Sequence, residues 1–105
     1  MVPGYISEIR PFAFDAVPEN WMPCNGQKLQ IREHQALYSL VGNIYGGDGM
    51  TTFQLPDLRA AVAIHRSERH PVGDRVQPSS SVPTEEQGVV AVNYCICING
   101  VYPSR

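Results

Sequence analysis

Glycine and proline restrict this chain to short elements joined by many turns. Nine glycines and nine prolines together make up about a sixth of its 105 residues. Both residue types destabilise the interiors of helices and strands, so long regular elements are disfavoured. A chain of this length forms one domain with a modest hydrophobic core. We therefore expect residues 1–105 to fold as a single small domain without a long helix.

The closing segment Val89–Ile98 is apolar at nearly every position and rich in β-branched residues. Such a run is typical of a strand that is covered on both faces. Arg32–Val41 has apolar residues at helical spacing, and Gly42 suits the position after a helix end, although no good capping side chain precedes the helix. These patterns predict an α+β fold, with one helix packed on a few short strands and the C-terminal strand central.

The remaining strands are expected to be short. Asn25-Gly26 is typical of a type I′ turn, which predicts a hairpin between residues 21–24 and 27–31. Two further strands are expected at 5–10, between flanking prolines, and at 60–65, where apolar residues alternate.

The glycine-rich stretch Tyr45–Gly49 predicts a sharp turn that directs Phe53 and Leu55 into the core. It lacks the spacing of a phosphate-binding loop and the alternating acidic residues of a calcium-binding loop, so a structural role is favoured. The residues assigned to this turn are Gly46, Gly47, Asp48 and Gly49.

A second structural turn is expected at Asp57 and Arg59. An aspartate at such a position bonds backbone amides, and an arginine two residues later can fork onto carbonyls or a carboxylate. We favour a structural role for this pair over ligand binding.

The three cysteines leave two interpretations open. In the first, all three are buried thiols. In the second, Cys24 forms one disulfide with Cys95 or Cys97. If the protein functions outside a cell, we expect Cys24 to lie close to the closing strand. We also expect Cys95 and Cys97 to face opposite sides of that strand, so that at most one of them pairs with Cys24 within a subunit.

No residue pattern predicts catalysis, a metal site or a cofactor. His34, His65 and His70 are scattered, no Cys-x-x-Cys spacing occurs, and no cysteine is placed where its pKa would be lowered. The net charge of −2 gives no argument for a nucleic-acid partner, and no apolar run is long enough to enter a membrane. The N-terminus does not resemble a secretory signal, so we expect synthesis in the cytoplasm without a signal peptide.

Residues 66–88 differ in composition from the rest of the chain. They are polar and rich in proline and serine, which predicts a connection or an arm rather than core. The few apolar side chains in this segment cannot offset the conformational entropy that is lost when it becomes ordered. We therefore expect a neighbouring subunit to hold it in place. The predicted anchors are Val72, Val76 and Val82.

Several motifs in order resemble the phage tail collar domain family, which includes the microcystin-dependent proteins. They are Gly4–Arg10, Trp21–Gln27, Ala36–Gly42, Tyr45–Gly49, Thr52–Arg59 and Asn93–Arg105. The resemblance implies a small mixed α and β domain of phage tail fibres and related devices, assembled as an oligomer and without enzymatic activity. Its partners would be copies of itself and other tail or surface-structure proteins, in a virion tail or an extracellular assembly.

Two departures from the family pattern affect the functional expectation. Only 66–88 occupies the place of the family's long Gly/Ser-rich insert, no His-x-His motif occurs, and Ala60 stands where glycine is common. In the family the insert resembles a receptor-facing tip. We therefore expect a self-assembling structural subunit, with an adhesin that recognises a cell-surface glycan or protein as the alternative.

Overall fold

The structure is a computed structural model that describes residues 4–59, 61, 63–75 and 90–104. The described residues form seven short elements. They are β1 (Ile9–Phe12), β2 (Trp21–Pro23), β3 (Lys28–Gln30), the 3₁₀ turn η1 (Ile31–Glu33), α1 (Gln35–Val41), β4 (Thr52–Gln54) and β5 (Asn93–Cys97). One α-helix and antiparallel sheets are consistent with the predicted α+β class.

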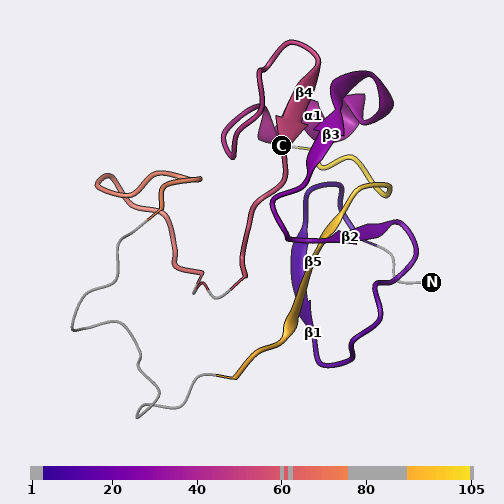
Figure 1. The fold of residues 1–105 in the computed structure, drawn as a ribbon, viewed down its shortest axis with the longest axis vertical. Coiled ribbons are helices and arrows are strands. Elements are labelled where there is room, and N and C mark those ends of the chain that lie inside the picture. The colour runs from indigo at the N-terminus through magenta and orange to yellow at the C-terminus, as the bar shows by residue number, and fades with distance from the viewer. Residues whose placement is uncertain (1–3, 60, 62, 76–89, 105) are drawn as a thin grey trace.

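The strands form two antiparallel sheets (Figure 1). The larger has the order β1-β5-β2, and the smaller pairs β3 with β4. In the larger sheet Ile9 lies opposite Ile96, and Trp21 lies opposite Cys97. The prediction that the C-terminal strand is central is therefore confirmed for this sheet.

Both faces of β5 are covered. Ile96 packs in the main core cluster with Leu37, Phe53 and Leu55, all almost completely buried. Cys95 and Cys97 instead pack with Trp21 in a second cluster. Burial on two faces agrees with the near-continuous apolar pattern of this segment.

The strand is nevertheless shorter than the apolar run predicted. Val90 and Val92 are 83% and 44% exposed, and neither belongs to β5. Val89 lies outside the described residues. Apolar composition alone therefore placed the start of the strand too early.

The expected helix is confirmed over its second part. η1 covers residues 31–33, and His34, with φ −138°, separates it from α1. No side chain caps the start of α1, as expected, and the N–H of Gly42 donates to the carbonyl of Tyr38 at its end, 2.7 Å away. Leu37 and Val41 are the buried residues of the helix.

The predicted hairpin at Asn25-Gly26 is wrong. β2 pairs with β5 and β3 pairs with β4, so the two flanking strands belong to different sheets. Gly26 has φ +73°, but Asn25 is not among the described residues with positive φ, as a type I′ turn requires. Residues 24–27 instead bond to residues 55–58, through Leu55 N to Gln27 O, Gly26 N to Pro56 O and Leu58 N to Cys24 O.

Two other strand predictions need correction. The first strand is Ile9–Phe12 rather than 5–10, and Tyr5 makes only an isolated bridge with Val101. Residues 61 and 63–65 form no strand, and Ile64 is 61% exposed, so no sheet face covers it.

Among the described residues, no helix has the length and apolar character needed to cross a membrane.

Candidate functional site

The glycine-rich turn before β4 is held by the carboxylate of Asp48. Its Oδ1 accepts hydrogen bonds from the backbone N–H groups of Met50, Thr51 and Thr52 at 2.8, 2.8 and 2.9 Å. Its Oδ2 accepts one from the Thr51 hydroxyl at 3.0 Å. These bonds hold the pKa of Asp48 well below its ordinary value, and the bond from the Thr52 N–H has the largest effect. The turn is therefore fixed around a charged carboxylate.

The glycines let the same turn lie along the outer edge of β4. Gly46, Gly47 and Gly49 all have positive φ, and a Cβ on Gly47 would lie 2.5 Å from the Cα of Phe53. Gln54 N–H donates to the Gly46 carbonyl at 3.1 Å, and Gly49 N–H donates to the Thr52 carbonyl at 3.0 Å. The loop thus occupies backbone groups that β4 would otherwise present to another strand.

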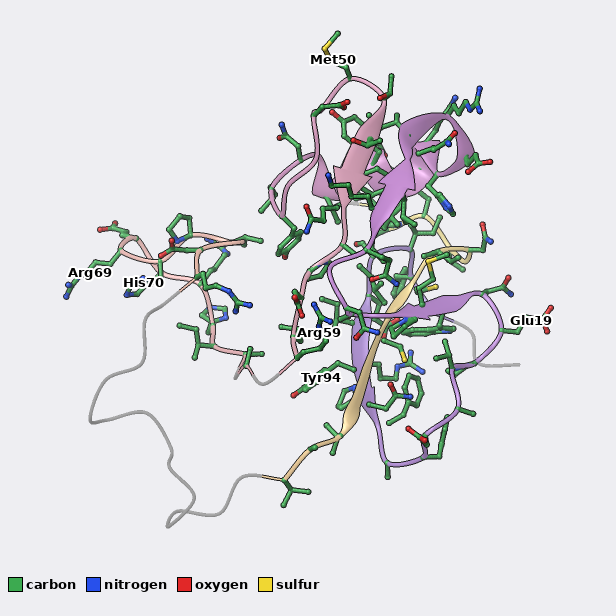
Figure 2. All side chains as sticks on the ribbon, viewed as in Figure 1. Glu19, Met50, Arg59, Arg69, His70 and Tyr94 are labelled. Carbon is green, nitrogen blue, oxygen red and sulfur yellow. The ribbon has the colours of Figure 1, made fainter. Side chains whose placement is uncertain are left out.

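The turn also separates buried from exposed residues. Phe53 and Leu55 are 0% and 1% exposed, which confirms that they reach the core. Met50 is 83% exposed and projects away from the body at the end where β4 lies (Figure 2). The hydrogen-bonded backbone of this turn therefore presents the apolar side chain of Met50 to solvent.

Asp57 and Arg59 form a compact ion pair. Arg59 Nε and Nη2 donate to Asp57 Oδ1 and Oδ2 at 2.9 and 2.8 Å, and Arg59 N–H donates to Oδ1 at 3.1 Å. These bonds lower the pKa of Asp57 to about 2. Arg75 Nη2 also donates to the Asp57 carbonyl, 3.3 Å away. The Arg75 side chain therefore joins its own segment to the backbone at Asp57.

A small polar hollow of about 100 Å³ lies beside this pair. Arg59 and Tyr94 are close together in Figure 2 and both line it. The other lining residues are Cys24, Asn25, Leu58, Val92 and Asn93. The side-chain N–H₂ of Asn93 donates to the carbonyls of Phe14 and Ala16 at 3.3 and 3.0 Å, so this wall is held in place.

A larger, open hollow of about 320 Å³ is lined by Gly4, Tyr5, Glu8, Arg10 and Val101. The N-terminal and C-terminal segments meet here, because Val101 N–H donates to Gly4 O at 3.0 Å and Ile6 N–H donates to Val101 O at 2.9 Å. Tyr5 and Val101 are 57% and 60% exposed, so the hollow has apolar walls that face solvent.

The charged wall of this hollow is internally paired. Arg10 Nη2 and Nε donate to Glu8 Oε2 at 2.7 and 3.1 Å, and Tyr5 N–H donates to Glu8 Oε1 at 2.9 Å. The bonds from Arg10, then that from Tyr5, lower the pKa of Glu8. The Arg10 guanidinium also lies 5.0 Å from the centroid of the Trp21 ring, within cation–π range. Sequence reasoning missed this group, although Glu8 and Arg10 stand two residues apart in a strand-like stretch.

All three cysteines are free and buried. Burial raises the pKa of Cys24 to about 12 and also raises the pKa values of Cys95 and Cys97. The expectation that Cys95 and Cys97 face opposite sides of the strand is wrong, because residues two apart share a face. Cys24 packs in the other cluster, with Ile96.

The remaining predicted residues are not brought together. Val72 is 52% exposed, and Val76 and Val82 lie outside the described residues. His70 Nδ1 lies 2.8 Å from Asp74 Oδ2, within a local turn. Within the described ranges, no group of three or more His, Cys, Asp or Glu side chains could hold a metal ion.

Residues 7–63, more than half of the chain, match the phage tail collar domain family. The chain therefore belongs to this family, and the resemblance inferred from its motifs is confirmed. Both turns, at 46–49 and at 57–59, fall within the match. No curated protein matches the sequence. Membership of this family indicates a structural component of a phage tail.

Proposed function

We propose that the protein is a structural subunit of a phage-tail-derived fibre, collar or extracellular filament, which acts by associating with copies of itself and not by catalysis. The observation that carries this proposal is the match to the phage tail collar domain family over residues 7–63. Other tail or surface-structure proteins are further partners in this proposal.

The distribution of apolar side chains supports self-association. The described surface exposes large hydrophobic residues from both ends of the chain and from the loops between. Met50 and Val90 are each 83% exposed, and Phe14 is 51% exposed. Single exposed apolar residues are common in monomers, but aromatic residues and methionine are enriched at interfaces.

The strand edges favour contacts through side chains rather than through added strands. Pro11 lies in β1 and Pro23 in β2, and these are the two outer strands of the larger sheet. Proline has no N–H to donate to a further strand. The glycine-rich loop covers β4, and Lys28 is exposed on β3, where a charge disfavours edge pairing.

In this proposal residues 66–88 make an additional contact, with Val72, Val76 and Val82 as anchors on the adjacent subunit. The exposure of Val72 supports this role, because the side chain is not used within its own subunit's core. Electron microscopy of the purified native protein tests the proposal. We expect repeating rings or filaments; uniform particles too small to resolve at micromolar concentration would contradict it.

An adhesin that recognises a cell-surface glycan or protein is the second candidate. It is favoured by the polar hollow beside Arg59, where amide, guanidinium and phenol groups converge. At about 100 Å³ the hollow has room for roughly three water molecules, which is small for a sugar ring and places this function second. Binding to a glycan array that is lost in Tyr94→Ala would establish it.

A further inference from the structure

The chain contains two Asn-Gly pairs, and the fold places them in different surroundings. Asn25-Gly26 joins β2 to β3, and Asn99-Gly100 follows β5. An Asn-Gly pair is chemically reactive, because glycine has no Cβ to hinder the approach of its backbone nitrogen to the asparagine side chain. In a folded protein the reaction also requires that this nitrogen and this side chain are free to move together.

The first pair is held by hydrogen bonds. Gly26 N–H donates to the Pro56 carbonyl at 3.1 Å, and Asn25 forms an antiparallel bridge with Asp57. Further backbone bonds between residues 24–27 and 55–58 hold the chain on either side of the pair. Before the Gly26 nitrogen can react, this contact must open locally, and the opening costs the free energy of the bonds that it breaks.

The second pair is free at both reacting groups. Asn99 and Gly100 are both exposed. Within the described part of the chain, neither the Asn99 side chain nor the Gly100 N–H makes a hydrogen bond. The N–H groups on either side are bonded: Asn99 N–H donates to the Asn20 carbonyl at 3.3 Å, and Val101 N–H donates to the Gly4 carbonyl at 3.0 Å. Of these three consecutive N–H groups, that of Gly100 alone is unbonded.

The fold also requires glycine after Asn99. A Cβ at position 100 would overlap the carbonyl oxygen of Gly4 and would lie 3.0 Å from the Sγ of Cys97. The close approach of the two terminal segments therefore excludes a larger residue at the position where a side chain would slow the reaction.

We propose that Asn99 is a site of spontaneous deamidation in the folded protein, with water as the only co-reactant. The Gly100 nitrogen gives up its proton to base and attacks the side-chain carbonyl carbon of Asn99, forming a new C–N bond. The bond from that carbon to the side-chain nitrogen breaks, and the nitrogen leaves as ammonia after taking up a proton. Water then adds to either carbonyl of the cyclic imide and breaks one of its C–N bonds, which yields aspartate or isoaspartate.

Both products alter the place where the two ends of the chain meet. Each adds a negative charge to a chain whose net charge is −2. Isoaspartate also adds a methylene group to the backbone between β5 and Val101. This shifts Val101 relative to Gly4 and Ile6, with which it makes backbone hydrogen bonds of 3.0 and 2.9 Å. Isoaspartate at this position should therefore lower the melting temperature of the aged protein.

Peptide mapping by tandem mass spectrometry tests the proposal on the full chain, incubated folded at mildly alkaline pH. Deamidation at Asn99 should be at least about tenfold faster than at Asn25, because the Gly26 N–H must first lose its hydrogen bond. The rate at Asn99 should rise with pH, since the attacking nitrogen must be deprotonated. In the urea-unfolded chain the two pairs should react at similar rates, because the fold no longer distinguishes them.

Two variants provide a matched comparison. Asn99→Gln should remove the fast reaction of the folded chain, because glutamine closes the corresponding larger ring much more slowly. Asn25→Gln is the control and should leave that reaction unchanged, and melting curves establish that both variants are folded. Equal rates at the two sites of the folded chain, faster reaction at Asn25, or an inert Asn99 in a folded chain that reacts when unfolded would each overturn the proposal. None of these outcomes bears on the proposed function, because the reaction takes place within one chain.

Discussion

Asp48 is the residue on which the geometry of the turn at 46–49 depends most, because its carboxylate accepts the hydrogen bonds that hold the turn. We expect Asp48→Ala to lower the melting temperature, because the N–H groups of Met50, Thr51 and Thr52 lose their acceptor. Asp48→Asn should have a smaller effect, since an amide oxygen can replace one carboxylate oxygen. The matched control is Asp15→Asn, at an exposed carboxylate with no hydrogen bond among the described contacts. Equal melting temperatures for all variants would contradict this role.

Asp57 should make stability depend on pH in acid. Its pKa is about 2 in the folded chain, below the ordinary value of about 3.9, so the charged form is favoured by folding. This contribution is fully present above about pH 4 and is lost as the pH falls towards 2. Urea unfolding at pH 7 and in this acid range should show the loss in the wild type, and Asp57→Asn should reduce it. An unchanged pH profile in the variant would contradict the assignment.

The cysteines should remain thiols in the native protein. Burial raises all three pKa values, so little thiolate is available at neutral pH and alkylation of the folded chain should be slow. After unfolding without a reductant, intact mass should show three labels. A single label would instead show that two of the three cysteines are joined in a disulfide.

Truncation of Phe53 and of Met50 should affect stability to very different extents. Phe53→Ala removes a fully buried ring and should lower the free energy of unfolding by about 3–5 kcal/mol. Met50→Ala removes an exposed side chain and should change it by less than about 0.5 kcal/mol. Chemical denaturation measures both, and similar losses in the two variants would place Met50 in the core instead.

At the scale of elements, residues 66–88 are tested by removal. Deleting Ser67–Thr84 and joining the ends with a short Gly-Ser linker should leave the two sheets intact, because β5 pairs with β1 and β2. The proposal expects a folded monomer that no longer assembles, because the anchors at Val72, Val76 and Val82 are gone. Native assembly by the deletion variant would show that the segment is dispensable.

Local patterns predicted some elements well. The apolar spacing in α1 and the glycine that ends it are short-range signals, and both were found. The long apolar run located β5 and its central place, because a strand covered on both faces must be apolar on both. The run could not define the start of the strand, since Val90 and Val92 are apolar and yet exposed.

Long-range pairing is what the sequence could not reveal. Asn25-Gly26 carries a hairpin signal, but residues 24–27 bond to 55–58, some thirty positions away. The hollow beside Val101 likewise depends on the meeting of the two ends of the chain at Tyr5. The turns at 46–49 and 57–59 could be predicted from the sequence, because the side-chain hydrogen bonds of Asp48 and Asp57 join residues at most a few positions apart.

At the scale of the whole molecule, a small core carries a surface with many apolar side chains. Ile96 and Phe53 anchor one buried cluster, and Trp21 anchors another. Proline or a covering loop limits strand addition at most of the described edges. The proposed self-association would therefore use side-chain contacts, which would allow the same domain to serve in a ring or in a filament.

Sedimentation velocity of the purified full chain, over a wide range of concentration, tests self-association most directly. The account predicts species well above the monomer mass of 11.6 kDa, with a distribution that moves to larger sizes as concentration rises. A single boundary at 11.6 kDa across the whole range would contradict it.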